Sequence, residues 1–97
     1  MEIPNELDGA NVILYTDNSL QNQFGYVDTI NENNVNIGVT QIAAIAICKY
    51  IDGVGYYLFS CNCNWEVIGD TFHDTLEEAK EHADVSFFVK EDDWNIR

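Results

Sequence analysis

Carboxylates are the most numerous side chains of this sequence that could take part in binding or catalysis. Seventeen Asp and Glu residues stand against four Lys and Arg residues, which gives a formal net charge of −13. A charge so far from zero keeps a protein soluble but works against its compaction, so we expect a function that retains it. A strongly basic partner, or mimicry of a polyanion, would be such a function.

The acids are denser in the C-terminal third, where ten of the seventeen lie at or after position 66. Helical spacing would place Glu77, Glu81 and Asp84 within about 60° of one another. Acids in a first helical turn favour the helix dipole, whereas the acids outside that turn have no such explanation. The alternative is an acidic face that is merely solvated. We predict a partner-binding surface, and its residues would be Asp70, Asp74, Glu77, Glu81 and Asp84.

Aromatic side chains could supply anchors for such a surface, because Trp and Tyr dominate binding hot spots. In a chain of 97 residues most of the aromatics must belong to the core. Trp65 is the best exception, since it lies beside a turn and at the start of the acidic third. We therefore add Trp65 to the predicted partner-binding residues.

Metal binding and catalysis have little support in the residue pattern. Cys61 and Cys63 alternate along an expected strand and would point to opposite faces, so they would not converge on one ion. His73 and His82 are the remaining soft ligands, and no C-x-x-C pair is present. The chain also has no phosphate-binding glycine loop, nucleophile elbow or H-E-x-x-H motif. We expect neither a metal nor a cofactor, and a binding protein rather than an enzyme.

Composition indicates one globular domain over residues 1–97, since 46% of the residues are hydrophobic and 12% are aromatic. The N-terminus has no signal-peptide pattern. The longest aliphatic run, Ile42–Cys48, is far shorter than the roughly 18 to 20 residues that span a bilayer. The odd number of cysteines (Cys48, Cys61 and Cys63) favours reduced thiols, although one bridge would also be compatible with three residues. We expect a cytoplasmic protein that binds neither membrane nor nucleic acid.

The N-terminal half predicts short strands that would form an antiparallel sheet. The residues up to Gly9 are interpreted as a mobile lead-in. Val12–Thr16 is a β-prone apolar run that ends in turn residues. Phe24–Ile30 and Val35–Val39 flank the asparagine-rich stretch 31–34, which predicts a hairpin there.

A second hairpin is the strongest local signal. The apolar runs Ile42–Ile51 and Tyr56–Cys63 flank Asp52-Gly53-Val54-Gly55, where glycine supplies the positive φ of a tight turn. Pairing Asp52 with Gly55 would place Tyr50 opposite Tyr57, Cys48 opposite Phe59 and Ala46 opposite Cys61. Such continuous apolarity predicts central strands that are covered on both faces.

The hydrophobic period changes after a further short strand at Trp65–Ile68. Thr75 is the expected N-cap of a helix, and Glu78 is its capping-box partner. Leu76, Ala79, Ala83 and Phe87 would form the stripe of this helix that faces the sheet, with His82 on its solvent side. Trp94 and Ile96 are expected to fold back as an apolar anchor. The fold class is thus α+β, an antiparallel meander of about five strands with one helix of the C-terminal third packed on it.

One stretch of the chain resembles a known group of proteins. It comprises Tyr57-Leu58-Phe59-Ser60-Cys61 and continues from Trp65-Glu66-Val67-Ile68-Gly69-Asp70 to Thr75-Leu76-Glu77-Glu78-Ala79. The stretch resembles small acidic immunity proteins of contact-dependent inhibition and related polymorphic toxin systems. The resemblance implies a cytoplasmic antidote that binds one cognate toxin domain, often a nuclease. It implies no functional residues, because the matched stretch contains no known inhibitory motif.

The charge and the resemblance together predict an inhibitor of a basic toxin that occludes its active site with an acidic surface. The alternative is a polyanion mimic that blocks another nucleic-acid-binding protein, such as a phage-encoded inhibitor. A third class, a small enzyme or ligand carrier, would require a deep pocket. The oligomeric state is not indicated by the sequence.

Overall fold

The computed structural model describes residues 3–17, 26–30, 32–34, 36–51 and 53–96 of the chain. In chain order its elements are β1 (Glu6–Leu7), β2 (Ala10–Asp17), β3 (Tyr26–Ile30), β4 (Asn36–Gln41), β5 (Ala44–Lys49), β6 (Tyr56–Cys61), β7 (Val67–His73), helix α1 (Leu76–Phe87), the 3-10 turn η1 (Glu91–Asp93) and β8 (Asn95–Ile96). The predicted lead-in and the hairpin at residues 31–34 fall partly outside the described residues.

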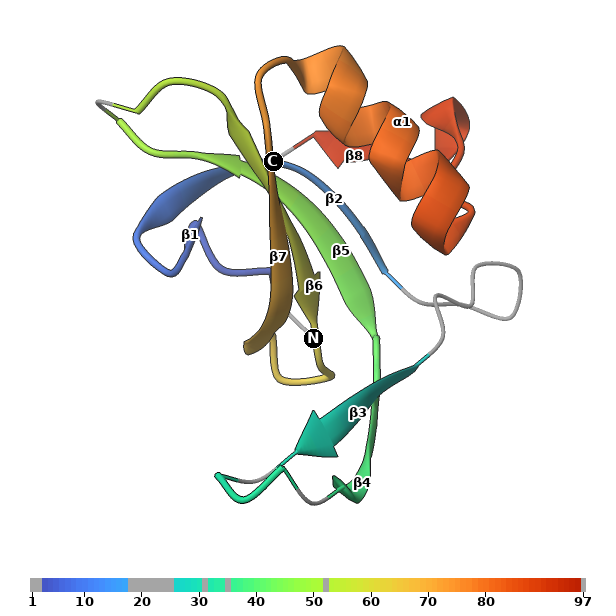
Figure 1. The fold of residues 1–97 in the computed structure, drawn as a ribbon. Coiled ribbons are helices and arrows are strands. Elements are labelled where there is room, and N and C mark those ends of the chain that lie inside the picture. The colour runs from blue at the N-terminus through green and yellow to red at the C-terminus, as the bar shows by residue number, and fades with distance from the viewer. Residues whose placement is uncertain (1–2, 18–25, 31, 35, 52, 97) are drawn as a thin grey trace.

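The main sheet is antiparallel, with the strand order β1-β2-β5-β6-β7 and with β8 paired to β2. β3 and β4 form a separate two-stranded sheet, which the chain enters between β2 and β5. Helix α1 lies against one face of the main sheet (Figure 1). The α+β class, the meander and the helix in the C-terminal third are therefore confirmed.

Strand β5 is buried on both of its faces. Ile45 and Ile47 point to the side of the sheet on which Ala79 and Ala83 of α1 pack, and we call this the helix face. The alternate residues of β5 point to the other side, which we call the β1 face. The cluster on the β1 face consists of Leu7, Ala10, Val12, Ala44, Ala46, Cys48, Phe59, Cys61 and Trp65. The prediction that the central strands are covered on both faces is confirmed.

The N-terminal segment belongs to the fold, so its interpretation as a mobile lead-in is wrong for the described residues. Leu7 pairs with Ala10 and is only 4% exposed. Between them Asp8 (φ 50°) and Gly9 (φ 83°) have the two positive φ angles of a type I′ hairpin turn. The Asp-Gly dipeptide was the local signal for this hairpin, and the strand before it was too short to show a period.

The β5–β6 hairpin forms as expected, but its register differs by two residues from the prediction. Cys48 pairs with Tyr57, and the preceding pairs follow the same offset: Ala46 with Phe59 and Ala44 with Cys61. The turn begins earlier than expected, because the Gly53 amide donates to the Tyr50 carbonyl at 3.1 Å. A shift of two residues keeps every side chain on its original face, so the core is the predicted one.

The strand predicted at Trp65–Ile68 is displaced. β7 begins at Val67, continues through Gly69 and Asp70 and ends at His73. Trp65 precedes it in a connection with φ 61°. The pairing of β6 with β7 shifts register between the Ser60–Gly69 and Cys61–Val67 pairs, and this bulge places Asp70 on the same face as Val67.

Helix α1 begins where the sequence predicts. The Thr75 hydroxyl accepts a hydrogen bond from the Glu78 amide at 3.1 Å, whereas the Glu78 carboxylate accepts from the Asp74 amide at 3.3 Å rather than from Thr75. The N-cap is thus confirmed, and the reciprocal half of the capping box is displaced by one residue. Two alanines of the apolar stripe are fully buried and allow the helix to approach the sheet closely.

The C-terminal segment returns to the sheet through one of its two apolar residues. Trp94 is partly buried and packs against the cluster on the helix face. Ile96 lies in β8 opposite Leu14, but its side chain is 86% exposed. Trp94 therefore acts as the expected anchor and Ile96 does not.

We expect replacement of Gly55 by alanine to destabilise the fold by about 2–4 kcal/mol. Gly55 has φ 86°, and a Cβ there would lie 2.7 Å from the His73 carbonyl oxygen and 2.5 Å from the Phe72 ring. Gly69→Ala is the matched control, because its φ is not in the left-handed region and the nearest atom to its Cβ would be the Ser60 Oγ at 3.4 Å. Urea denaturation of both variants measures the difference. Equal losses of unfolding free energy would contradict this account of Gly55.

Candidate functional site

Each lysine of the described chain contacts a carboxylate or an aromatic ring of the same chain. Lys80 forms an ion pair with Glu91 at 2.8 Å, and Lys90 pairs with Asp84. Lys49 places its ammonium 5.0 Å from the centroid of the Tyr56 ring. The remaining cation, at position 97, lies outside the described residues. Residues 74–93 contain eight carboxylates and two lysines, so six negative charges there have no counter-charge in the segment.

Four of the predicted partner-binding residues lie together along this segment, which we call the α1 acidic surface. They are Asp74, Glu77, Glu81 and Asp84. Glu77 and Glu81 are exposed one helical turn apart, and neither is in an ion pair among the described residues. Asp84 forms an ion pair with Lys90, so its charge is the least available of the four for binding a partner.

Asp70 lies on the other side of the sheet, so the predicted surface is not continuous. It pairs with Phe59 across β6 and β7, and paired residues of antiparallel strands point to the same face. Phe59 belongs to the β1 face, away from α1. The sequence interpretation ended the strand before Asp70 and could not assign its face.

Trp65 is also on the β1 face, where it is 7% exposed. Its conformation follows from the β6–β7 connection, in which the Asn62 side-chain oxygen accepts from the amides of Asn64 (2.9 Å) and Glu66 (3.0 Å). The indole packs edge to face against Tyr15, with ring centroids 6.2 Å apart. The expectation of an exposed Trp65 is therefore corrected to a buried one, and its role in partner binding stays a prediction.

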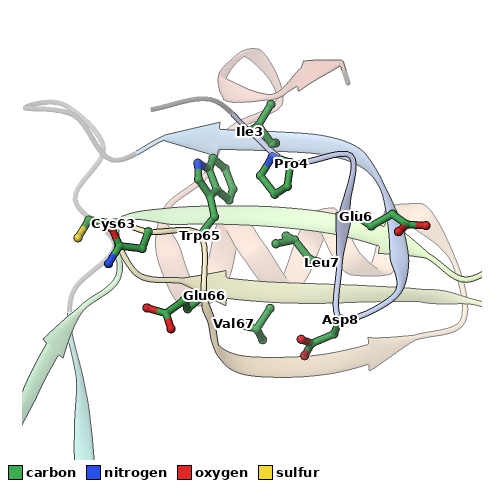
Figure 2. Close-up of a pocket in the computed structure, with 10 residues that line it drawn as sticks. Ile3, Pro4, Glu6, Leu7, Asp8, Cys63, Trp65, Glu66 and Val67 are labelled. Atoms are coloured by element: carbon green, nitrogen blue, oxygen red, sulfur yellow. The ribbon is translucent and has the colours of Figure 1, made fainter.

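A cleft of about 940 Å³ opens on the β1 face between the N-terminal segment and the β6–β7 connection. Figure 2 shows Glu6 and Asp8 extending from the N-terminal side, and Glu66 from the connection. Leu7, Trp65 and Val67 supply apolar walls, and among the described residues that line the cleft there is neither Lys nor Arg. Sequence reasoning missed Glu6 and Asp8 because it interpreted their segment as a lead-in.

Two histidines meet where α1 packs on β7. The rings of His73 and His82 lie 4.9 Å apart, so His82 is not on the solvent side as expected. The pKa of His73 is lowered, first by burial and then by His82, while Glu78 and Asp74 oppose the shift. The Thr71 hydroxyl lies 2.8 Å from the His73 Nε2. Among the described residues, no group of three or more His, Cys, Asp or Glu side chains could hold a metal ion.

The three cysteines are free thiols. Cys48 and Cys61 are fully buried on the β1 face, and burial raises the pKa of each thiol to about 12. Cys63 is exposed at the rim of the cleft. The two buried thiols act as small apolar core residues rather than as nucleophiles.

The comparisons with known proteins give no match to a protein family model, to a curated protein or to a solved structure. The resemblance to immunity proteins therefore stays a prediction. Within the described part of the chain, no helix has the length and apolarity needed to cross a membrane.

We expect one thiol per chain to react with a thiol reagent in the native protein and three in denaturant. Cys63 is accessible, whereas the other two thiols are buried and protonated at neutral pH. Titration with Ellman's reagent measures the count, and Cys63→Ser should remove the native signal. Rapid labelling of Cys48 or Cys61 in the native protein would contradict the packing of the β1 face.

We expect the histidine pair to lower stability as the pH falls below the usual histidine pKa of 6.5. The folded state depresses the pKa of His73, so the unfolded chain binds more protons between 6.5 and the lowered value. The penalty is absent above 6.5 and grows as the pH falls through that window. Protonation of carboxylates changes stability in the same range, so the comparison needs a variant.

His82→Gln is that variant, because it removes the repulsion between the two imidazoles. We expect the unfolding free energy of the variant to fall less than that of the native sequence between about pH 7.5 and 5.5. Urea denaturation at both pH values measures the difference. Parallel pH profiles would show that the pair does not interact.

Proposed function

We propose that this protein is a cytoplasmic immunity protein that binds a cognate basic toxin domain and neutralises it. The kind of toxin that we favour is a nuclease. The α1 acidic surface would cover the active site of the toxin. The observation that carries the proposal is the excess of six negative charges over residues 74–93, on a chain whose described lysines are already engaged. The resemblance of residues 57–79 to immunity proteins supports the same function.

A nuclease suits this surface because such enzymes hold phosphates with Lys and Arg, and carboxylates can replace the phosphates. Complementary charge accelerates association, to as much as about 10⁸–10⁹ M⁻¹s⁻¹ at low salt. A standard interface takes about 800 Å² from each partner, or roughly an eighth of the 6156 Å² of this protein. An interface of standard size would therefore occupy only a small part of the surface of this protein.

The helix also presents its charges in a fixed arrangement. Ala79 and Ala83 are fully buried against the sheet, Thr75 caps the first turn, and Phe88 ends the helix with φ 61°. A surface that is ordered before binding loses less conformational entropy on association. A binding role fits this arrangement better than catalysis, and no cofactor is part of the proposal.

A polyanion mimic that blocks another nucleic-acid-binding protein is the second candidate. Duplex DNA carries about one charge per 1.7 Å of its axis. Asp84 shares its charge with Lys90, and Lys80 interrupts the row of carboxylates on α1. These two lysines lower the charge density along the helix, which favours the toxin inhibitor.

We expect Glu81→Lys to weaken binding to the partner by about tenfold at low salt and to flatten the salt dependence. A tagged pull-down from the native host, washed at low and then high salt, would supply the partner, and surface plasmon resonance would give the rates. Adding Glu77→Lys should extend both effects. Both residues are exposed, and neither is in an ion pair among the described residues. Glu81→Lys should leave the fold unchanged, whereas Glu77→Lys should cost about 0.3–1 kcal/mol because Glu77 lies in the first turn of the helix.

The matched control is Glu32→Lys, which makes the same charge change at an exposed residue between β3 and β4. It should leave the association rate close to that of the native protein. An equal loss in the control would show that net charge acts without a defined surface. Unchanged affinity in the Glu77→Lys/Glu81→Lys variant would remove α1 from the interface.

A further inference from the structure

Strand β7 is an open edge of the main sheet. It is the last strand in the sheet order, and among the described residues its backbone pairs only with β6 (Figure 1). In a strand that is paired on one side, alternate amides and carbonyls point away from the sheet. None of the seven residues of β7 is buried, whereas five of the six residues of β5 are. The outer backbone groups of β7 are therefore available for pairing.

The usual protections of an edge strand are largely missing from β7. Such protections are a short length, lysine or proline on the edge, and a bulge that twists the strand away. β1, at the opposite end of the sheet, has only two residues. β7 contains neither proline nor lysine, and its bulge lies at its start, between Val67 and Gly69. Residues 69–73 pair regularly with β6 and offer a template for a further strand.

Phe72 is a fixed aromatic ring on this edge. Its side chain is 50% exposed. The ring packs edge to face against Tyr57, with centroids 5.2 Å apart, and a Cβ on Gly55 would lie 2.5 Å from it. The ring is therefore held by β6 and by the β5–β6 turn while half of it stays uncovered. Aromatic side chains are enriched in interfaces, and a side chain that is ordered before binding loses less entropy on association.

Asp70 lies two residues before Phe72, and both side chains are on the β1 face. Asp70 is exposed and forms no ion pair among the described residues. A second copy of this chain is a poor occupant of the edge, because each copy carries a charge of −13 and would bring its own Asp70. A strand with a cation opposite Asp70 and an aliphatic residue opposite Phe72 would form two favourable cross-strand pairs.

We propose that β7 takes an extended segment of a partner protein as an added strand, with a Lys or Arg residue opposite Asp70 and an aliphatic residue opposite Phe72. The backbone groups of β7 that point away from β6 supply the hydrogen bonds, and the two side-chain pairs fix the register. The site does not depend on the toxin-inhibitor proposal, because β7 contributes no residue to the α1 acidic surface.

The test is a titration that follows the backbone amides in nitrogen–proton NMR spectra. The probe is the heptapeptide Thr-Lys-Thr-Val-Thr-Lys-Thr with both ends blocked. Its symmetric pattern places the valine opposite Phe72 and a lysine opposite Asp70 in either strand direction. We expect saturable shifts of the amides of residues 69–73, with slower hydrogen exchange at alternate ones. The amides of residues 77–84 in α1 are the internal reference.

Two controls separate strand addition from attraction of charge and from self-association. The same peptide with N-methyl groups on its three central residues keeps both lysines but loses the central N–H donors, and it should bind at least about tenfold more weakly. Equal binding of the two peptides, shifts confined to α1, or no saturable shift would overturn the proposal. Sedimentation of the protein alone should show a monomer. A dimer that protects the amides of residues 69–73 would make a second copy the occupant, and the proposal would be wrong.

Asp70→Lys is the variant that tests the register. It places a lysine opposite the lysine of the peptide, so we expect the affinity to fall about tenfold. The matched control is Glu81→Lys, which makes the same charge change on α1 and should leave the affinity within about twofold. Equal losses in both variants would reduce the effect to net charge and overturn the site. A peptide with glutamate in place of both lysines should prefer the Asp70→Lys variant to the native protein, and the absence of that preference would contradict the register.

Discussion

The burial of β5 on both faces is the constraint on which the rest of the structure depends. A strand that is apolar on both sides must be covered on both faces of the sheet, and a chain of 97 residues has few elements that can do so. Helix α1 covers one face with the small side chains Ala79 and Ala83. The N-terminal segment and Trp65 cover the other face. Both covers are acidic on their outer sides, so the charge of the protein is divided between two opposite surfaces.

The elements that the sequence predicted are those whose signals are local. The strand at 12–16, the Gly53–Gly55 hairpin and the helix with its Thr75 N-cap depend on neighbours only a few residues away. Long-range packing decided the features that were missed. Leu7 is held by its pairing with Ala10 and by the β1-face core, and the periodicity of a two-residue strand cannot be seen in a sequence.

The candidate site was only half predictable for the same reason. Helical spacing can be seen in the sequence, and it placed Glu77, Glu81 and Asp84 on one side of the helix that the structure contains. The face of Asp70 depends on the bulge between Val67 and Gly69, which a strict alternation along the sequence does not predict. The cleft could not be predicted at all, because Glu6 and Glu66 are 60 residues apart and line one cleft only through the folded sheet. Sequence reasoning located the charge, and only the fold located its two surfaces.

The separate β3–β4 sheet has a consequence for how this fold can vary in length. Asp17 at the end of β2 pairs directly with Ala44 at the start of β5. The chain between them therefore leaves the main sheet and returns to the same place. The cost of closing a loop grows slowly with its length, so segments of quite different size could occupy this position while every pairing of the main sheet is kept. Insertion or exchange of whole segments is thus best accommodated here.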